Sequence, residues 1–442
     1  MNMKKFIAAV LAAASVLSLA GCGNNETSGL TDALTSKTDG TSSKPSTTSA
    51  TSSEANGTSS AEESNPEESS ATSTPAESKP TETDSVQVDW STVPELDEMD
   101  IDYEVKEAKD IANDLEFVFG LNEDVKKNGM VIITAYYGDA EYIKIPQTIA
   151  GKSNIAVKNN VRDFVNWGDN AKAIKYPDGF VSFSSRTSNL CFSGSGKAPN
   201  VTSVSLPDNM EFITMFNGLQ SLEEITLPKN LKTIEDNAFA GCEKLKSVTF
   251  GKDIEEIGYS AFSNCSSLET VNFPEKLSGE CVINSGVFAY CSSLKSIKLP
   301  EGIDFSLDIE SMYSGGGAFT MCTALEKVSL PSTVKALDNM IFGGCESLKE
   351  IKLSSGLETI GFKAFDGCKS LKEIDIPDGM TTIGASAFNG CTSLKEIDIP
   401  DSVTLIGENA FSTGVDIKVN YKGKTYNEKN VEKLYGKDLG TM

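Results

Sequence analysis

Apolar and polar residues follow one fixed order through the C-terminal half of the chain. In a representative copy, residues 387–400 read AFNGCTSLKEIDIP. Its aliphatic side chains Leu394, Ile397 and Ile399 are spaced to share one face of a short strand, while Asp398 faces the other way. The proline that follows has no N–H to give to a ladder, so the strand ends there. The pattern predicts one short strand in each copy.

Seven cysteines mark successive copies of this order. They are Cys242, Cys265, Cys291, Cys322, Cys345, Cys368 and Cys391, at steps of 23, 26, 31, 23, 23 and 23 residues. A period of this size is typical of a solenoid, in which each coil buries its apolar residues only against its neighbours. Strands stacked about 4.8 Å apart form a parallel sheet. The sequence therefore predicts a β-rich solenoid with one strand per 23-residue coil and a cap at each end.

The copies differ in length on one arm only. The arm from the Ala-Phe pair to the residue after the strand is constant, whereas the return arm lengthens in two neighbouring copies, at 275–286 and 301–317. The second insert carries Phe305, Met312 and Tyr313, apolar residues for which the repeat has no evident core position. Extra chain in a loop adds little closure entropy and is free to serve recognition. We predict ligand contacts at these three residues; the alternative is that the inserts only fold over the coil edge.

The repeated order, A-F-x-G-C-x-x-L-x-x-I-x-I-P at 23-residue spacing, closely resembles the BspA-type leucine-rich repeat of bacterial surface proteins. The resemblance covers roughly residues 130–419. It implies a right-handed leucine-rich-repeat-type array and a role in surface binding or adhesion, and it does not transfer a ligand. Because the chain lacks the asparagine ladder of the commoner leucine-rich repeats, we expect an extended or irregular outer wall rather than a helical one.

Reactive chemistry is sparse in this chain. It has no histidine, which removes the commonest general base and zinc ligand. The seven repeat cysteines occupy equivalent places, and Ala198 and Leu219 stand in that place in earlier copies, which indicates core packing rather than catalysis. One thiol per coil cannot surround a metal ion, and stacked side chains favour free thiols over disulfides. We expect no enzyme activity, cofactor or metal; Cys191 and Cys281 lie outside the ladder and receive no role.

The N-terminus has the features of an export signal. Two lysines precede the apolar run 6–19, which is too short to span a membrane. The sequence Leu19-Ala20-Gly21-Cys22 resembles a lipobox, so residues 1–21 are predicted to be a lipoprotein signal peptide and Cys22 the lipid-modified residue that attaches the protein to the membrane. The alternative is ordinary signal cleavage near Ala20.

Differences in composition and pattern divide the rest of the chain into a tether, a capping region, the solenoid and a C-terminal cap. In 24–85, 29 of 62 residues are Ser or Thr and none is aromatic, so 22–85 is predicted to be a disordered tether behind the lipidated cysteine. Residues 86–200 are predicted to form a capping region with degenerate first coils, including a short helix near Val105, Ala108 and Ile111 and strands at 130–137 and 142–146. The solenoid follows at 201–419 and a C-terminal cap at 420–442.

The net charge and the residues at outward strand positions limit the classes of partner that the protein can bind. A formal net charge of −24 argues against nucleic acid as a partner. The outward strand positions carry no aromatic residue, which favours a solvated or protein-facing strand face. Many unpaired thiols in an exported protein suggest an anoxic habitat. We expect a monomer on the outer face of the cell membrane of an anaerobic monoderm bacterium, binding an extracellular protein or glycan; the alternative is a structural or accessory envelope lipoprotein without its own ligand.

Overall fold

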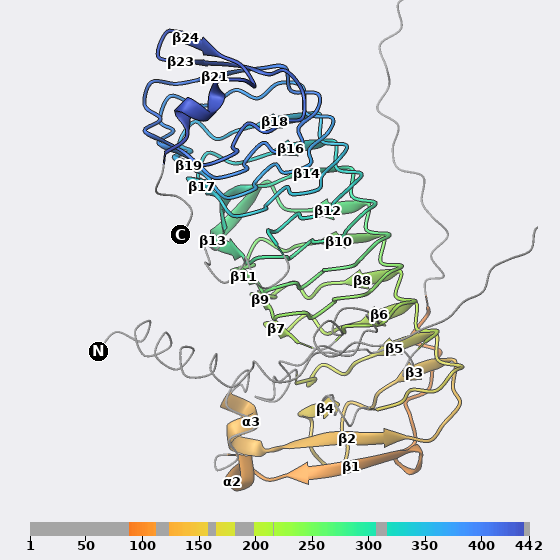
Figure 1. The fold of residues 1–442 in the computed structure, drawn as a ribbon. Helices are drawn as coiled ribbons and strands as arrows, with labels where there is room; N and C mark the ends of the chain where they lie inside the picture. Colours follow the sequence, from red (N-terminus) through yellow and green to blue (C-terminus); the bar gives the residue numbers. More distant parts are fainter. Residues whose placement is uncertain are drawn as a thin grey trace, which may run out of the picture. The chain divides into compact units, whose positions relative to one another are not determined.

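The computed structural model describes residues 88–111, 123–157, 165–181, 199–214, 216–305 and 316–436. Their chain winds into a parallel-sheet solenoid of about 11 turns with coils of about 23 residues, which confirms the predicted fold class. Figure 1 shows the coils stacked one on another, with two rows of short strands running along the stack. The predicted signal peptide, Cys22 and the predicted tether lie outside the described residues.

The predicted strands form the first row. They are β3 (Tyr142–Lys144), β5 (Ala173–Lys175), β6 (Ser203–Ser205), β8 (Glu224–Thr226), β10 (Ser247–Thr249), β12 (Thr270–Asn272), β14 (Ser296–Lys298), β16 (Lys327–Ser329), β18 (Glu350–Lys352), β21 (Glu396–Ile399) and β23 (Lys418–Tyr421). Paired strands of this row run parallel, one coil apart. In β21 the side chains of Ile397 and Ile399 are buried and that of Asp398 is exposed, as the alternation predicts.

A second strand in most coils forms the other row, so the prediction of one strand per coil is incomplete. These strands are β7 (Phe212–Ile213), β9 (Thr233–Ile234), β11 (Glu256–Ile257), β13 (Lys276–Ile283), β15 (Glu301–Phe305), β17 (Ala336–Leu337), β19 (Thr359–Ile360), β20 (Thr382–Ile383) and β22 (Leu405–Ile406). Most have only two residues, one of them buried. Two residues are too few to show an alternation in the sequence.

Phenylalanine rings fill the core between the two rows. One ring from each coil stacks on the next with centroids 5.1–5.9 Å apart: Phe216, Phe239, Phe262, Phe288, Phe319, Phe342, Phe365, Phe388 and Phe411. All of them are buried. Offset stacking of aromatic rings adds to the free energy gained by burying them, so the stack joins the coils into one continuous core.

The N-terminal end is closed by a small mixed sheet. Strand β1 (Ile101–Lys106) pairs antiparallel with β2 (Met130–Tyr136), and β2 pairs parallel with β4 (Ile155–Val157). A 3-10 helix, η1 (Glu98–Asp100), and two short helices, α2 (Ala108–Ile111) and α3 (Glu123–Asn128), flank this sheet.

One expectation for the N-terminal region needs correction. The helix expected near Val105 starts only at Ala108, because Val105 belongs to β1. The first parallel row begins at β3, within residues 86–200, where degenerate first coils were predicted. These early coils lack the Ala-Phe and Cys residues that mark the later copies, which makes the repeat degenerate in this region.

The C-terminal end is closed by a hairpin. Strand β23 continues the first row, and β24 (Lys424–Tyr426) folds back antiparallel onto it. After the 3-10 helix η4 (Val431–Leu434), the Gly436 N–H donates to the carbonyl oxygen of Ile406 in β22. The second row therefore also has its final strand partly covered.

Candidate ligand-binding surfaces

The seven repeat cysteines lie in the core as free thiols. Each is fully buried, and none forms a disulfide. Each thiol donates a hydrogen bond of 3.1–3.3 Å to the main-chain carbonyl oxygen of the phenylalanine one coil earlier. Burial raises the pKa of Cys242, Cys322 and Cys391 to about 12. A buried, protonated thiol is neither a good nucleophile nor a metal ligand, so these residues act in packing.

The two lengthened coils do not form loose loops where they are described. Strand β13 pairs parallel with β15, with an irregularity between Lys276 and Cys281, and the pair continues the second row beyond β11. Leu277, Cys281 and Ile283 of β13 are buried, as is Ile303 of β15. The inserts therefore extend both the second sheet and the core, and Cys281, which the sequence left without a role, is a core residue.

Phe305 does not present its side chain to a ligand. It ends β15, is 4% exposed, and meets Phe319 edge-on with ring centroids 6.4 Å apart. The expectation that the core has no position for this residue is corrected here, because the longer β15 creates one. Met312 and Tyr313, the other two predicted contact residues, lie outside the described residues.

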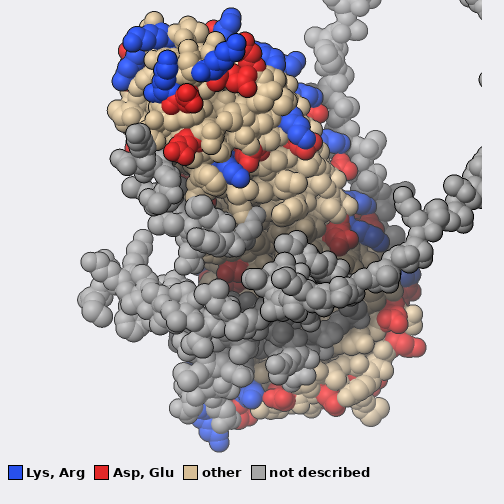
Figure 2. Space-filling model, viewed as in Figure 1, with Lys and Arg blue, Asp and Glu red and all other residues tan. Residues whose placement is uncertain are grey.

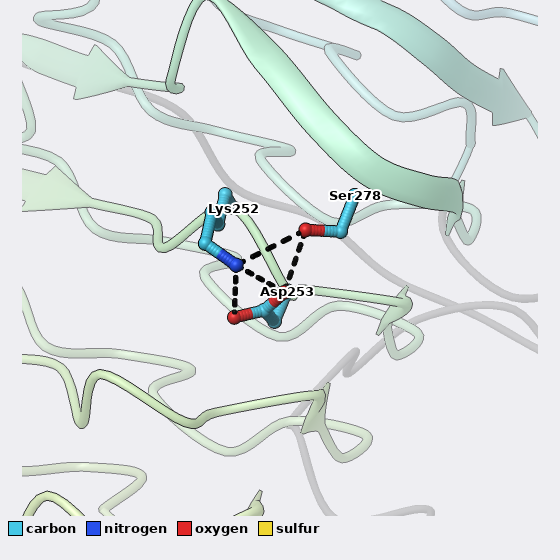
Figure 3. A network of polar contacts seen from close by, with 3 residues as sticks. All are labelled: Lys252, Asp253 and Ser278. Carbon is cyan, nitrogen blue, oxygen red and sulfur yellow. Dashed lines mark hydrogen bonds and ion pairs between the residues drawn. The ribbon is translucent and has the colours of Figure 1, made fainter.

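A polar network fixes the start of β13 to the coil before it. Figure 3 shows Lys252, Asp253 and Ser278 in mutual contact. The Ser278 hydroxyl donates to Asp253 Oδ1 at 2.6 Å, and Lys252 Nζ lies 2.9 Å from the same oxygen and 3.3 Å from Ser278 Oγ. The hydrogen bond from Ser278, followed by that from Lys252, lowers the pKa of Asp253. The network thus links the base of the insert to the preceding coil.

The outward side chains of the extended second row carry mostly negative charge. Glu256, Val282 and Asp304 are register partners across β11, β13 and β15, and all three are exposed. Glu280 lies on the exposed side of β13 as well. Val282 is 37% exposed, an aliphatic side chain between two carboxylates. This column is a candidate surface for a partner with an apolar contact and positive charge.

The outward face of the first row is polar. Its middle strands carry Ser247, Thr249, Thr270 and Asn272, all exposed. Towards the C-terminus, lysines and glutamates of neighbouring coils form exposed pairs, such as Lys327 Nζ and Glu350 Oε1 at 3.0 Å. Figure 2 shows both charge signs interspersed over the C-terminal coils. Exposed pairs contribute little to stability, so this face is a solvated surface of mixed charge.

A hollow of about 810 Å³ lies where the N-terminal sheet meets the first coils. Its lining includes three carboxylates, Asp124, Asp178 and Glu211, and the rings of Phe180 and Phe212. Two of the carboxylates have partners: Asp124 accepts from Asn154 Nδ2 at 2.8 Å, and Glu211 pairs with Lys232 at 3.0 Å. The hollow is therefore a cleft of mixed apolar and polar lining, in which two of the three carboxylates already have a partner.

No helix among the described residues is long and apolar enough to cross a membrane.

Comparison with known proteins agrees with this architecture. Residues 186–308 and 314–427 match the BspA type leucine rich repeat region, in six copies. The match spans more than half of the chain, and the chain belongs to this family. Leucine-rich-repeat solenoids typically serve as binding scaffolds rather than enzymes. No curated protein matches the chain.

Several solved structures are similar in fold. A leucine-rich repeat protein from Bacteroides ovatus is 24% identical, with 72% of this chain and 92% of that chain covered and a TM-score of 0.31. A leucine rich cell surface protein from Faecalibacterium prausnitzii is 22% identical, with 71% and 94% covered and a TM-score of 0.29. The pneumococcal vaccine antigen PcpA is 21% identical, with 71% and 77% covered and a TM-score of 0.37.

Proposed function

We propose that this protein is a non-enzymatic lipoprotein that is held on the outer face of the cell membrane by lipid on Cys22 and binds an extracellular protein or glycan through the outside of its solenoid. Its family supports a binding role, because leucine-rich-repeat solenoids typically serve as binding scaffolds. The lipobox-like sequence 19–22 after a short apolar run supports the anchor.

The observation that carries the proposal is that the recurring residues of the repeat are buried in the core, which leaves the outer surface for contact with other molecules. The recurring Phe and Cys residues all point inward and are buried, and the thiols are engaged with carbonyl oxygens. What the described coils offer to other molecules is a regular outer surface, fixed by a core that runs through the whole stack. Such a rigid surface loses little conformational entropy on binding, which favours affinity.

The extended second row is the part of this surface that departs most from the repeat. Strands β13 and β15 are longer than the other strands of their row and expose Glu280, Val282 and Asp304. The side chain of Val282 is an apolar group that the core does not use, surrounded by carboxylates. We place the main protein-binding contact here, with a partner that offers a basic rim.

The experiment uses the full-length protein in mild detergent on an array of extracellular proteins and an array of glycans. We expect binding to at least one feature. Val282→Ser together with Glu280→Lys should reduce binding to a protein feature about tenfold, equivalent to about 1.4 kcal/mol. Lys352→Glu, on the outward face of the first row, is the matched control and should leave binding unchanged. Removing 303–317 is unsuitable as a test, because Ile303 and Phe305 belong to the core.

Two results would contradict the proposal. Failure of the parent protein to bind any feature would favour an accessory envelope role, the alternative without a ligand. Equal loss of binding in the control variant would remove the extended second row as the contact surface.

A further inference from the structure

The residue before each repeat cysteine has a left-handed backbone. These residues are Gly241, Asn264, Tyr290, Met321, Gly344, Gly367 and Gly390, with φ between 61° and 76°. In this conformation each N–H reaches the next coil; that of Gly367, for example, donates to the carbonyl oxygen of Asn389 at 2.7 Å. Glycine adopts such a φ without strain, and asparagine tolerates it. A bulky side chain in this conformation is a genuine outlier.

Two consecutive coils place bulky residues in this strained position. Tyr290 has φ 63° and Met321 has φ 61°. Full burial of the side chain does not offset this backbone strain, because Tyr290 is 45% exposed and Met321 is 39% exposed. The Tyr290 N–H donates to the carbonyl oxygen of Thr320, so the two residues are neighbours on the stack. Strain without burial at adjacent positions points to a function for the exposed side chains.

The space available at this position does not by itself explain why Tyr290 and Met321 occupy it. At Gly367 an added Cβ would come no closer than 3.8 Å to another atom, so a side chain fits and only the backbone disfavours it. Met321 reaches over the following coil, since a Cβ on Gly344 would lie 2.3 Å from its sulfur. The two side chains therefore cover the outside of the turn rather than fill a gap in the core.

The turns around these residues are uncharged. In the three consecutive segments 261–268, 287–294 and 318–325 there is no Asp, Glu, Lys or Arg, although the chain carries a net charge of −24. The position after each cysteine is Ser266, Ser292 and Thr323 in these coils, whereas it is Glu243 in the coil before them and Glu346 in the coil after them. Charge is thus absent within these turns and returns directly after them, at Glu269, Lys295 and Glu326, and in the coils on either side.

The polar groups of this patch remain able to bind. Ser292 Oγ donates to the Ser266 carbonyl oxygen at 3.3 Å, which leaves its lone pairs to accept. Asn264 Nδ2 donates to Ser263 Oγ at 2.9 Å, and among the described residues its carbonyl oxygen accepts no hydrogen bond. Hydroxyl and amide groups therefore surround an exposed phenol ring and a thioether.

We propose that Tyr290 and Met321, with Asn264, Ser292 and Thr323 beside them, form a binding patch for a neutral carbohydrate. A sugar ring has one face of C–H groups that packs on an aromatic ring, and hydroxyl groups that pair with serine, threonine and asparagine. An anionic glycan would find no cation in the three segments, and the strand face lacks the aromatic residue that Tyr290 supplies here. The inference rests on the proposed binding function and gives it a ligand class and a second surface.

The test is a glycan array with neutral, sialylated and sulfated oligosaccharides, probed with the full-length protein. The site variant is Tyr290→Asn with Met321→Asn, because Asn264 shows that asparagine fits this conformation. Two controls match its changes: Lys363→Asn, at another residue with positive φ, and Tyr137→Asn, an exposed tyrosine in the residues after β2. Thermal unfolding of each variant checks that it is folded.

We expect the parent to bind neutral oligosaccharides, the site variant to lose about tenfold or more in affinity, and both controls to match the parent. Unchanged binding by the folded site variant, or binding only to charged glycans or to protein features, would overturn the carbohydrate patch and leave the proposed binding function standing. If the parent binds no feature on either array, both fail.

Discussion

The thiol of Cys368 donates a hydrogen bond of 3.2 Å to the main-chain carbonyl oxygen of Phe342, one coil earlier. That carbonyl also accepts the N–H of Cys345 at 3.1 Å. The same pair of bonds recurs along the solenoid, so each cysteine both fills space and satisfies a buried acceptor of its neighbour. Because an alanine can fill part of the space but has no donor, the repeat favours cysteine at this position.

Replacing Cys368 with alanine should therefore destabilise the protein modestly. We expect a loss of about 1–2 kcal/mol in the free energy of unfolding, from lost volume and the lost donor. Denaturant unfolding followed by circular dichroism measures it. Lys369→Ala, which removes only an exposed pair with Glu346, is the neighbouring control and should change stability by less than about 0.5 kcal/mol. A larger loss in the control than in Cys368→Ala would contradict this role of the thiol.

Phe365→Ala should be more damaging. Its ring stacks between those of Phe342 and Phe388, at 5.5 and 5.4 Å, and is fully buried. Truncation leaves a cavity and interrupts the stack, which should cost about 3–5 kcal/mol. Phe365→Leu keeps most of the volume and should cost clearly less. Equal unfolding midpoints for the two variants would mean that the ring stack does not carry the core.

Stability should fall at alkaline pH because of the thiols. Burial raises the pKa of Cys322 and Cys391 to about 12, from 9.0 in an exposed thiol. Between these values the unfolded chain releases protons that the folded chain retains, so the unfolded state is favoured as pH rises. Each such thiol lowers stability by about 1.4 kcal/mol per pH unit in this window, and below pH 9 it has no effect.

Unfolding midpoints from pH 7 to 10.5 measure this effect, with Cys322→Ala and Cys391→Ala as comparison. In the variant that carries both substitutions, stability should decline less steeply with rising pH than in the parent. Thiol-labelling kinetics provide a second readout, and labelling should be slow until denaturant is added. Rapid labelling of the seven repeat cysteines in the native protein, or identical pH slopes, would show that these thiols are accessible to solvent.

Backbone conformation at the turn gives a further prediction. Gly367 has φ 75° and open space around its missing Cβ. Gly367→Ala should cost about 1–2 kcal/mol through backbone strain alone. Gly379 lacks a positive φ and also has open space, so Gly379→Ala should be neutral or slightly stabilising. If the two substitutions had equal effects, the left-handed conformation before the cysteine would not be needed.

The fold could be predicted from the sequence because the same pattern of apolar and polar residues recurs in every copy of the repeat. The alternation around Ile397 and the constant arm from Phe388 to Pro400 are strong signals, since every coil must pack on its neighbours in the same way. The short second strands, such as β19, leave almost no pattern in the sequence. They exist because stacking the first row brings these segments side by side, and this is a tertiary effect that a local window misses.

The candidate surfaces were harder to predict. An insert that departs from the repeat was expected to be free of the core, and Phe305 shows that an insert can enlarge the core instead. Tyr290 stands at a position where most copies of the repeat have glycine, and this departure can be seen in the sequence. Its significance depends on φ and exposure, which the sequence alone does not show.

Display and binding together form the central claim, and one cell-based measurement tests both. Intact bacteria that express the parent chain or Cys22→Ser are applied to the protein and glycan arrays, with surface exposure of the solenoid measured by antibody. We predict that parent cells carry the antigen and bind, and that Cys22→Ser cells lose both, because serine cannot form the thioether to lipid. Cys22→Ser cells that remain coated with a normally processed protein, or parent cells that display the protein and bind nothing, would contradict the claim.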